Sequence, residues 1–197
     1  MDIIGGAGIS RAPTNFLAPA YVNHRKEMGL FGLHSSTSDI YATDESLEGG
    51  RMGAGFYVTR SRRAICCLVG RSCESRTSLR VETCASYLAL EHGKDIRAPI
   101  IILTDSANHL LELEDWVGPG KYPTLHTSAD GDIVRRVLEL LHHRVSMGFP
   151  TFFVKVRAHR GEPYNEAADR IASMVTEVEN TPLLWNVKVA VSSISLP

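Results

Sequence analysis

The chain has 197 residues, of which 44% are hydrophobic, so it is long enough for one globular α/β domain with an appended segment. Its formal net charge of -1 excludes a strongly basic protein, and any binding of nucleic acid has to come from a local patch. No apolar run reaches the roughly 18 to 20 residues that span a bilayer, and the N-terminus lacks a basic segment followed by an apolar stretch. We therefore expect a soluble intracellular protein, in the cytoplasm, the nucleus or an organelle, with no membrane partner.

Four cysteines are present, and they lack the paired spacing of a zinc site. They are Cys66, Cys67, Cys73 and Cys84. Because a neighbouring pair is an awkward geometry for disulfides, we expect reduced, packed thiols.

Residues 1–38 contain several glycines and prolines without a sustained periodicity, apart from the pattern of a short helix near residues 21–28. We interpret this segment as a loosely attached N-terminal extension. Three short strands are expected next, at residues 40–43, 54–59 and 64–69. The polar sequence Asp44-Glu45-Ser46 is interpreted as a turn after the first strand, and short connections predict an antiparallel meander.

From residue 78 onwards, helical and extended patterns alternate. Val81, Ala85, Leu88 and Ala89 have helical spacing, which predicts a helix over residues 78–92. Residues 99–104 show no alternation of apolar and polar residues, as in a central strand covered on both faces. Further helices are expected at residues 106–116, at 132–143 and from about 165, with strands at 152–156 and 184–191. This order predicts a mixed α/β sheet flanked by helices.

Four carboxylates occur where these elements could bring them together. Asp44 and Asp105 each follow an apolar strand, and they meet at one end of the sheet if those strands are adjacent and parallel. Glu82 and Asp169 lie on expected helices that could lean over the same point. Clustered carboxylates repel unless cations neutralise them, and oxygen ligands suit Mg²⁺ or Mn²⁺. Each acid taken singly is explained equally well as a turn former or helix cap.

Four segments resemble, in order, the motifs of type 1 ribonuclease H. They are Tyr41-Ala42-Thr43-Asp44-Glu45-Ser46 followed by glycines, Val81-Glu82-Thr83-Cys84-Ala85, Leu103-Thr104-Asp105-Ser106, and Ala158-His159-Arg160-Gly161 through Asn165-Glu166-Ala167-Ala168-Asp169. The resemblance implies a ribonuclease H-like α/β fold, in which a five-stranded mixed sheet has its first and fourth strands side by side and is flanked by helices. Residues 39–178 would then form a catalytic domain between the extension of residues 1–38 and a tail of residues 179–197.

The resemblance also implies an activity. The protein would be a metal-dependent endonuclease that hydrolyses the RNA strand of RNA–DNA hybrids by a two-metal mechanism. Asp44, Glu82, Asp105 and Asp169 would be the catalytic acids and would bind two divalent ions, Mg²⁺ or Mn²⁺. His159 would assist proton transfer or product release, with an exposed loop histidine as the alternative.

Substrate contacts are implied for five further residues, namely Glu45, Ser46, Ser106, Asn165 and Glu166. Contacts to the 2′-hydroxyl groups would come from Glu45, Ser46 and the glycines that follow, because glycine lets a backbone approach the minor groove closely. Asn165 and Glu166 are explained equally well as a helix cap with an acid in the first turn.

The chain departs from the family at two places. Glu45 stands where the family has glycine, and residues 117–131 offer only Lys121 in place of a basic protrusion. Arg60, Arg62 and Arg63 are candidate phosphate contacts, although a solvated turn explains them as well.

Other functions fit the same sequence. One is a catalytically weak or inactive module of this fold that serves nucleic-acid binding or assembly, and another is a different nuclease of the superfold. A free-standing enzyme and a domain derived from a retroelement reverse transcriptase are both compatible with the motifs. For the leading hypothesis we expect a monomer that acts on an RNA–DNA hybrid.

Overall fold

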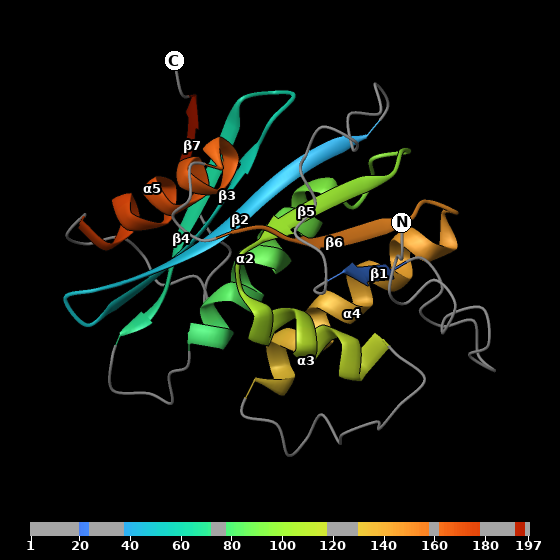
Figure 1. Ribbon diagram of the computed structural model, residues 1–197, viewed down its shortest axis with the longest axis horizontal. Helices are drawn as coiled ribbons and strands as arrows, with labels where there is room; N and C mark the ends of the chain where they lie inside the picture. Colours follow the sequence, from blue (N-terminus) through green and yellow to red (C-terminus); the bar gives the residue numbers. More distant parts are fainter. Residues whose placement is uncertain are drawn as a thin grey trace.

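The computed structural model describes residues 20–23, 38–71, 78–117, 130–157, 162–177 and 192–195. Its elements are β1 (Ala20–Asn23), β2 (Asp39–Glu48), β3 (Arg51–Val58), β4 (Arg63–Arg71), α2 (Ser78–Gly93), β5 (Ile100–Thr104), α3 (Ala107–Val117), α4 (Gly131–Ser146), β6 (Thr151–Lys155), α5 (Pro163–Glu177) and β7 (Ser192–Ser195) (Figure 1). The strands form one mixed sheet in the order β1-β6-β5-β2-β3-β4-β7. The expected five-stranded mixed sheet is confirmed in β2 to β6, and the short strands β1 and β7 extend it at its two edges.

Strand β2 lies in the middle of this sheet, antiparallel to β3 and parallel to β5. The adjacency that the family resemblance implies for the first and fourth expected strands is therefore confirmed. The parallel register pairs Ala42 with Leu103. Asp44 and Asp105 each lie two residues further along their chains, so this register brings them to the same region of the sheet.

The turn after β2 lies further along the chain than the sequence indicated. Strand β2 continues through Asp44 to Glu48, and the chain reverses at Gly49 and Gly50, where φ is 56° and 75°. Two consecutive positive φ angles are the conformation of a tight two-residue hairpin turn, which glycine adopts without steric strain. The interpretation of residues 44–46 as a turn was wrong, because these polar side chains contact other elements rather than solvent.

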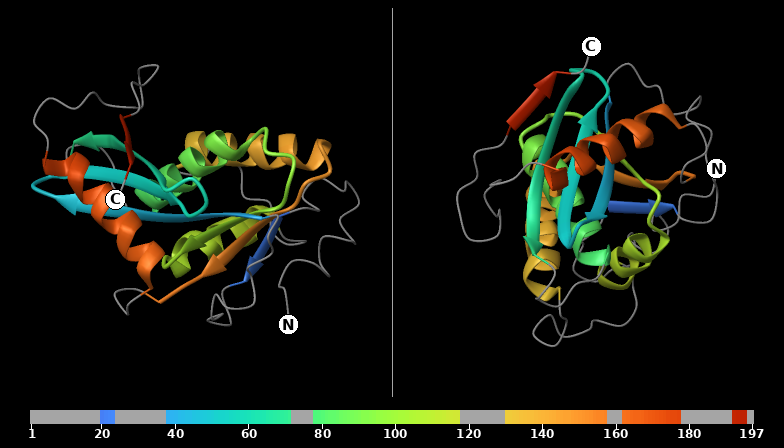
Figure 2. Two further views of the ribbon diagram at one scale, coloured as in Figure 1. Left: turned by 90° about the horizontal axis from the view of Figure 1, so that it is seen from above. Right: turned by 90° about the vertical axis from the view of Figure 1, so that its left-hand side faces the viewer.

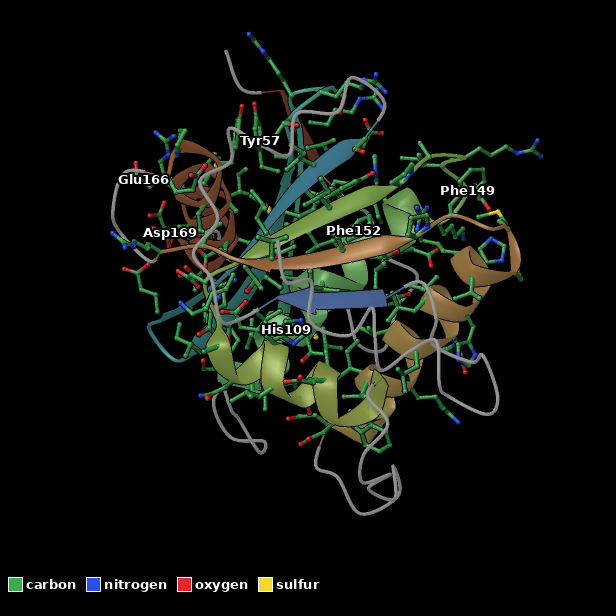
Figure 3. The ribbon with its side chains drawn as sticks, turned by 45° about the vertical axis from the view of Figure 1, so that its right-hand side comes forward. Tyr57, His109, Phe149, Phe152, Glu166 and Asp169 are labelled. Atoms are coloured by element: carbon green, nitrogen blue, oxygen red, sulfur yellow. The ribbon has the colours of Figure 1, made fainter. Side chains whose placement is uncertain are left out.

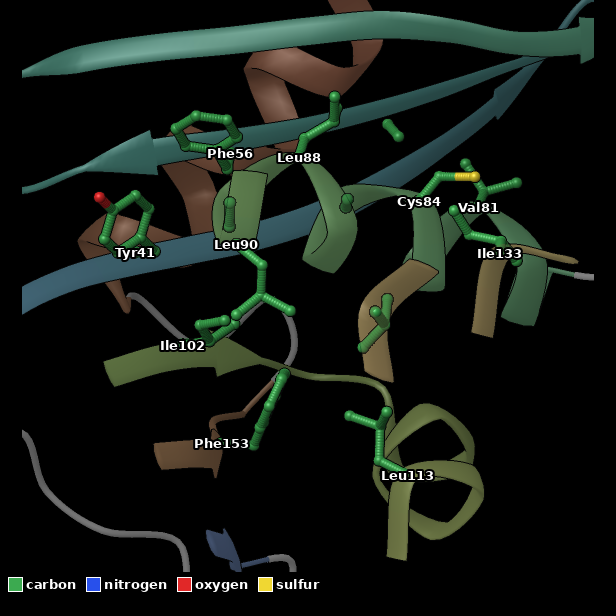
Figure 4. Close-up of a cluster of buried hydrophobic side chains, with 14 of the residues drawn as sticks. Tyr41, Phe56, Val81, Cys84, Leu88, Leu90, Ile102, Leu113, Ile133 and Phe153 are labelled. Carbon is green, nitrogen blue, oxygen red and sulfur yellow. The ribbon is translucent and has the colours of Figure 1, made fainter. Parts of the chain in front are cut away.

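Helices cover both faces of the sheet. Helix α5 packs on one face, and α2 with α4 on the other (Figure 2). All five residues of β5 are buried, as predicted for a strand covered on both sides. Its side chains alternate between two hydrophobic clusters: Ile102 joins Tyr41, Phe56 and Phe153 beneath α2 (Figure 4), whereas Ile101, on the other face, belongs to the cluster that contacts α5.

A fully buried arginine fixes the connection between α2 and β5. The guanidinium of Arg144 on α4 donates hydrogen bonds to the carbonyl oxygens of Gly93, Ile96 and Ala98, at 2.7, 3.0 and 2.7 Å. It also donates from Nε to Thr151 Oγ1 at 3.0 Å. Satisfying several donors of one guanidinium in this way removes the penalty of burying it. The start of the strand that leads to Asp105 is thereby held in place.

The four expected helices between residues 78 and 177 are confirmed as α2, α3, α4 and α5. The short helix expected near residues 21–28 was wrong over its first part, because Ala20–Asn23 forms a strand parallel to β6. That pairing depends on the exposed edge of β6, which a local pattern does not reveal. The strand expected at residues 184–191 lies outside the described residues, and β7 pairs antiparallel with β4.

The cysteines and the helix lengths bear on two expectations from composition. Cys66, Cys67 and Cys84 are buried free thiols, as expected, and Cys73 lies outside the described residues. In the described part of the chain, no helix combines the length and the apolar character that crossing a bilayer requires.

Helix α5 approaches the sheet closely because β3 has glycine beneath it. A Cβ atom at Gly53 would lie 2.3 Å from the carbonyl oxygen of Ala172 and 2.7 Å from Val175 Cγ1, and one at Gly55 would lie 2.9 Å from the Ala172 nitrogen. The interpretation that the glycines after Ser46 allow close approach to a minor groove is therefore wrong for Gly53 and Gly55. Helix α5 occupies the side of β3 on which a side chain at either position would lie.

We predict that Gly53→Ala lowers the free energy of unfolding by about 1–3 kcal/mol, because the new methyl group meets a backbone oxygen that moves only if α5 shifts. The reduced entropy of the unfolded chain acts in the opposite direction by only about 0.4–1 kcal/mol, so the steric term decides the sign. Urea denaturation measures the change, with Ser61→Ala in an exposed turn as the control. Equal stability of Gly53→Ala and wild type would contradict the close packing.

Candidate metal centre

Three carboxylates converge where the middle of β2 lies beside the end of β5. Asp44 belongs to β2, Glu82 to α2, and Asp105 directly follows β5. One ligand oxygen from each residue lies within 4.8 Å of the other two. Asp44 and Glu82 are only 5% and 3% exposed, and Asp105 is half-buried. The three acids therefore form a compact group that water reaches mainly from the side of Asp105.

Neighbouring groups orient the first two acids. The backbone N–H of Glu45 donates to Asp44 Oδ1 at 2.9 Å. The hydroxyl of Thr104, the last residue of β5, donates to Glu82 Oε2 at 3.5 Å and accepts from the Ser106 backbone N–H at 3.1 Å. Thr104 was not among the site residues predicted from the sequence. The sequence signal for it was a threonine at the end of a predicted strand, directly before the predicted ligand Asp105.

Asn165 joins two of the carboxylates. Its Nδ2 donates to Asp44 Oδ2 and to Asp105 Oδ2, each at 3.1 Å, and the residue is 2% exposed. The amide has to present nitrogen to these atoms, because its oxygen would repel both carboxylates. As a result, Asn165 Oδ1 is buried and has no hydrogen-bond partner in the described part of the chain.

The first turn of α5 decides between the two explanations of Asn165. The helix begins at Pro163, a residue suited to the first helical position, so Asn165 lies inside the helix and is not its cap. The helix-cap alternative was therefore wrong for Asn165. Glu166 is an exposed acid in the first turn, where a negative charge is favourable.

Burial and repulsion by neighbouring charges raise the pKa values of Asp44 and Glu82. Burial raises the pKa of Asp44 to about 8, and the charges of Asp105, Asp169 and Glu45 add to the effect. Burial also raises the pKa of Glu82 well above its usual range, with further contributions from Asp44, Glu45 and Asp105. The amide of Asn165 supplies hydrogen-bond donors to this group but no positive charge.

This donor set fits a hard divalent cation. Carboxylate oxygens that are close together and largely buried provide the ligands that Mg²⁺ and Mn²⁺ prefer. A cation among them would also favour the ionised form that burial and repulsion disfavour. Asp44, Glu82 and Asp105 are therefore the residues that could hold such an ion.

Asp169 stands at the margin of this group. It lies on α5, one turn after Asn165, and is half-buried (Figure 3). Its charge contributes to the raised pKa of Asp44, but it is not among the residues whose ligand oxygens lie within 4.8 Å of one another. The structure thus brings three of the four predicted acids within 4.8 Å of one another and leaves the fourth nearby.

The other predicted site residues differ in their surroundings. The Ser46 hydroxyl accepts a hydrogen bond from Ser173 Oγ at 3.2 Å, and Ser106 Oγ accepts from the His109 backbone N–H at 3.3 Å, which caps α3. Both hydroxyls therefore already accept hydrogen bonds within the protein. Glu45 is half-buried next to Asp44. His159 lies outside the described residues, and its predicted role stays a prediction.

The arginine-rich turn between β3 and β4 lies away from the acids. Arg60 pairs with Asp39 at 3.3 Å, while Arg62 and Arg63 are exposed. Asp39 is the first residue of β2 and precedes Asp44 by five positions, which corresponds to about 16 Å along an extended strand. Phosphate contacts by this turn would therefore involve a part of a substrate distant from the carboxylates.

Comparison with known proteins agrees with the motifs. The family model described as RNase H matches residues 37–177, more than half of the chain, and this confirms the resemblance. A protein named Ribonuclease H from the bacterium Treponema pallidum subsp. pallidum is 28% identical to this chain over 99 residues. The aligned part is 49% of this chain and 58% of that protein, so the chain spans little more than half the length of this relative.

We predict that Asp44 makes stability depend on pH when divalent cations are removed by a chelator. The folded protein holds the Asp44 proton up to about pH 8, whereas the ordinary pKa is 3.8. The stabilisation by this proton is complete below the ordinary pKa and is lost as the pH rises through the folded pKa, with a slope of at most about 1.4 kcal/mol per pH unit.

Urea denaturation at several pH values between about 5 and about 8 measures this slope. Asp44→Asn should remove its share of the decline, and saturating Mg²⁺ should flatten the wild-type profile. Identical slopes for wild type and Asp44→Asn would show that Asp44 titrates as an ordinary carboxyl group.

We also predict that Asn165→Asp destabilises the chelated protein more than Asn165→Ala does. Alanine removes two hydrogen bonds to carboxylates, a loss of about 1.5–3 kcal/mol each at most, whereas aspartate removes them and adds a further negative charge. Thermal unfolding with and without Mg²⁺ tests this, because the cation should recover more stability in the aspartate variant. Greater stability of Asn165→Asp than of Asn165→Ala in the chelator would refute the proposed geometry.

Proposed function

The chain belongs to the RNase H family, and on that premise we propose that it hydrolyses the RNA strand of RNA–DNA hybrids as a metal-dependent endonuclease. The observation that carries this proposal is the group formed by Asp44, Glu82 and Asp105, whose ligand oxygens lie within 4.8 Å of one another. A buried group of carboxylates is destabilising unless it binds a cation, and family membership supplies the chemistry for which such a cation would be used.

The proposed centre would bind Mg²⁺ or Mn²⁺ through Asp44, Glu82 and Asp105, with Asp169 contributing to a second ion. When bound, such ions would activate the attacking water and neutralise the charge on the leaving 3′ oxygen. Within the protein, Asn165 holds Asp44 and Asp105 in a fixed relation through its two hydrogen bonds. Thr104 does the same for Glu82 through its hydroxyl.

Protonation would couple cation binding to pH. Asp44 and Glu82 hold their protons more tightly than ordinary carboxyl groups do, because burial and repulsion disfavour their charged forms and raise their pKa values. Ligand carboxyl groups have to lose these protons, so cation affinity should rise with pH up to about the pKa of Asp44. This coupling is a property of the acids themselves and does not depend on the substrate.

Substrate residues complete the proposal. His159 would assist proton transfer or product release, as the motif around it implies. Glu166 is exposed in the first turn of α5, where it could meet a substrate. The hydroxyls of Ser46 and Ser106 already take part in hydrogen bonds with Ser173 and His109, so any contact they make with the hybrid would compete with those bonds.

We predict that the full-length protein cleaves the RNA strand of a labelled hybrid with Mg²⁺ or Mn²⁺ and leaves single- and double-stranded DNA intact. Asp105→Asn should reduce the rate at least about a hundredfold, because losing an oxygen ligand removes several kcal/mol of transition-state stabilisation. Asp95→Asn is the matched control, since Asp95 is an exposed acid that pairs with His143.

Three outcomes of this assay are informative. Inactivity of the wild type with both ions, or undiminished cleavage by Asp105→Asn, would reject the assignment. Binding of the hybrid without cleavage would instead favour the second candidate, a catalytically inactive module that binds nucleic acid.

A further inference from the structure

Glu45 adds a negatively charged side chain next to the three carboxylates. It follows Asp44 on β2 and pairs with Ala54, a buried residue of the cluster beneath α2. Successive strand residues point to opposite faces, so Glu45 and Asp44 leave the strand on different sides. Glu45 therefore faces α2, the helix that carries Glu82.

The Glu45 carboxylate is only partly satisfied. One of its interactions is a hydrogen bond with the Ser78 side chain at the start of α2. Its Oε2 is buried and has no hydrogen-bond partner among the residues that the structure describes. A buried acceptor without a donor is destabilising, and more so when it belongs to a charged group.

The charge of Glu45 reaches all three acids of the group. It contributes to the raised pKa values of Glu82 and Asp44, and its own pKa is raised by burial and then by Asp105. Its position therefore increases a repulsion that is already unfavourable. A neutral donor, such as a hydroxyl group, would satisfy Oε2 but would leave this repulsion, whereas a cation would relieve both.

We propose that Glu45 increases the affinity of the centre formed by Asp44, Glu82 and Asp105 for divalent cations. The inference rests on the proposed function, because it concerns the same site, and it deepens that function by assigning Glu45 to the binding of Mg²⁺ or Mn²⁺. Glu45 would act from the α2 side of the group as a charge close to the ion, since its oxygens are not among those that lie within 4.8 Å of one another.

The first test measures binding of Mg²⁺ and of Mn²⁺ to the full-length protein by isothermal titration calorimetry, without nucleic acid. Glu45→Gln keeps the size of the side chain and removes its charge, and we expect the Kd to rise on the order of tenfold. Glu48→Gln is the matched control, since Glu48 is an exposed acid on the same strand. Its Kd should change less than about twofold.

The second test measures thermal unfolding in a chelator and in Mg²⁺. Glu45→Gln should unfold at a higher temperature than wild type in the chelator, because repulsion is relieved, and should gain less from Mg²⁺. A purely structural role through Ser78 predicts the opposite, namely a lower unfolding temperature and an unchanged Kd. That combination, or a Kd within about twofold of wild type, would overturn the proposal.

Two further outcomes separate this inference from the proposed function. If the wild type binds cations in the way described but cleaves no hybrid, the proposed function fails and the role of Glu45 stands. If Glu45→Gln raises the KM for the hybrid while the Kd for the cation stays unchanged, Glu45 contacts substrate and the inference is wrong.

Discussion

Repulsion between buried carboxylates is the constraint on which the rest of this molecule depends. The parallel register of β2 and β5 brings Asp44 and Asp105 together, and α2 adds Glu82 from the face opposite α5. Keeping these groups close opposes folding, so packing elsewhere has to offset the electrostatic cost. The fully buried β5 and the hydrophobic clusters on both of its faces supply that packing.

The side-chain amide of Asn165 relieves part of this repulsion, and its position is linked to two glycines of β3. Asn165, which donates to both carboxylates, lies on α5, and this helix comes very close to β3 at Gly53 and Gly55, where any larger residue would meet the backbone of Ala172. Gly53 and Gly55, for which the sequence suggested substrate contact, thus affect the site by letting α5 lie close to the sheet. The geometry of the acid group therefore depends on how closely α5 packs against the sheet.

Much of the fold could be predicted because its signals are local. The continuous apolar run of β5 and the helical spacing in α2 mark their elements directly. The position of Asp44 inside a strand could not be read in this way, because a polar residue in a turn and one in a buried site look alike in sequence. The adjacency of Asp44 and Asp105 came from the family motifs, whereas the hydrogen bonds of Asn165 and the surroundings of the Glu45 carboxylate depend on tertiary contacts that no periodicity encodes.

The strands at the two edges of the sheet bear on where this domain can be cut. β1 pairs along β6 from Thr151 to Val154, and β7 pairs along β4 from Arg63 to Cys66. A fragment limited to residues 37–177, the span of the family match, would lack both and would turn β4 and β6 into edge strands. Unpaired backbone donors and acceptors on an edge invite pairing with a second chain. A protein trimmed to residues 37–177 would therefore be shorter and also more prone to self-association.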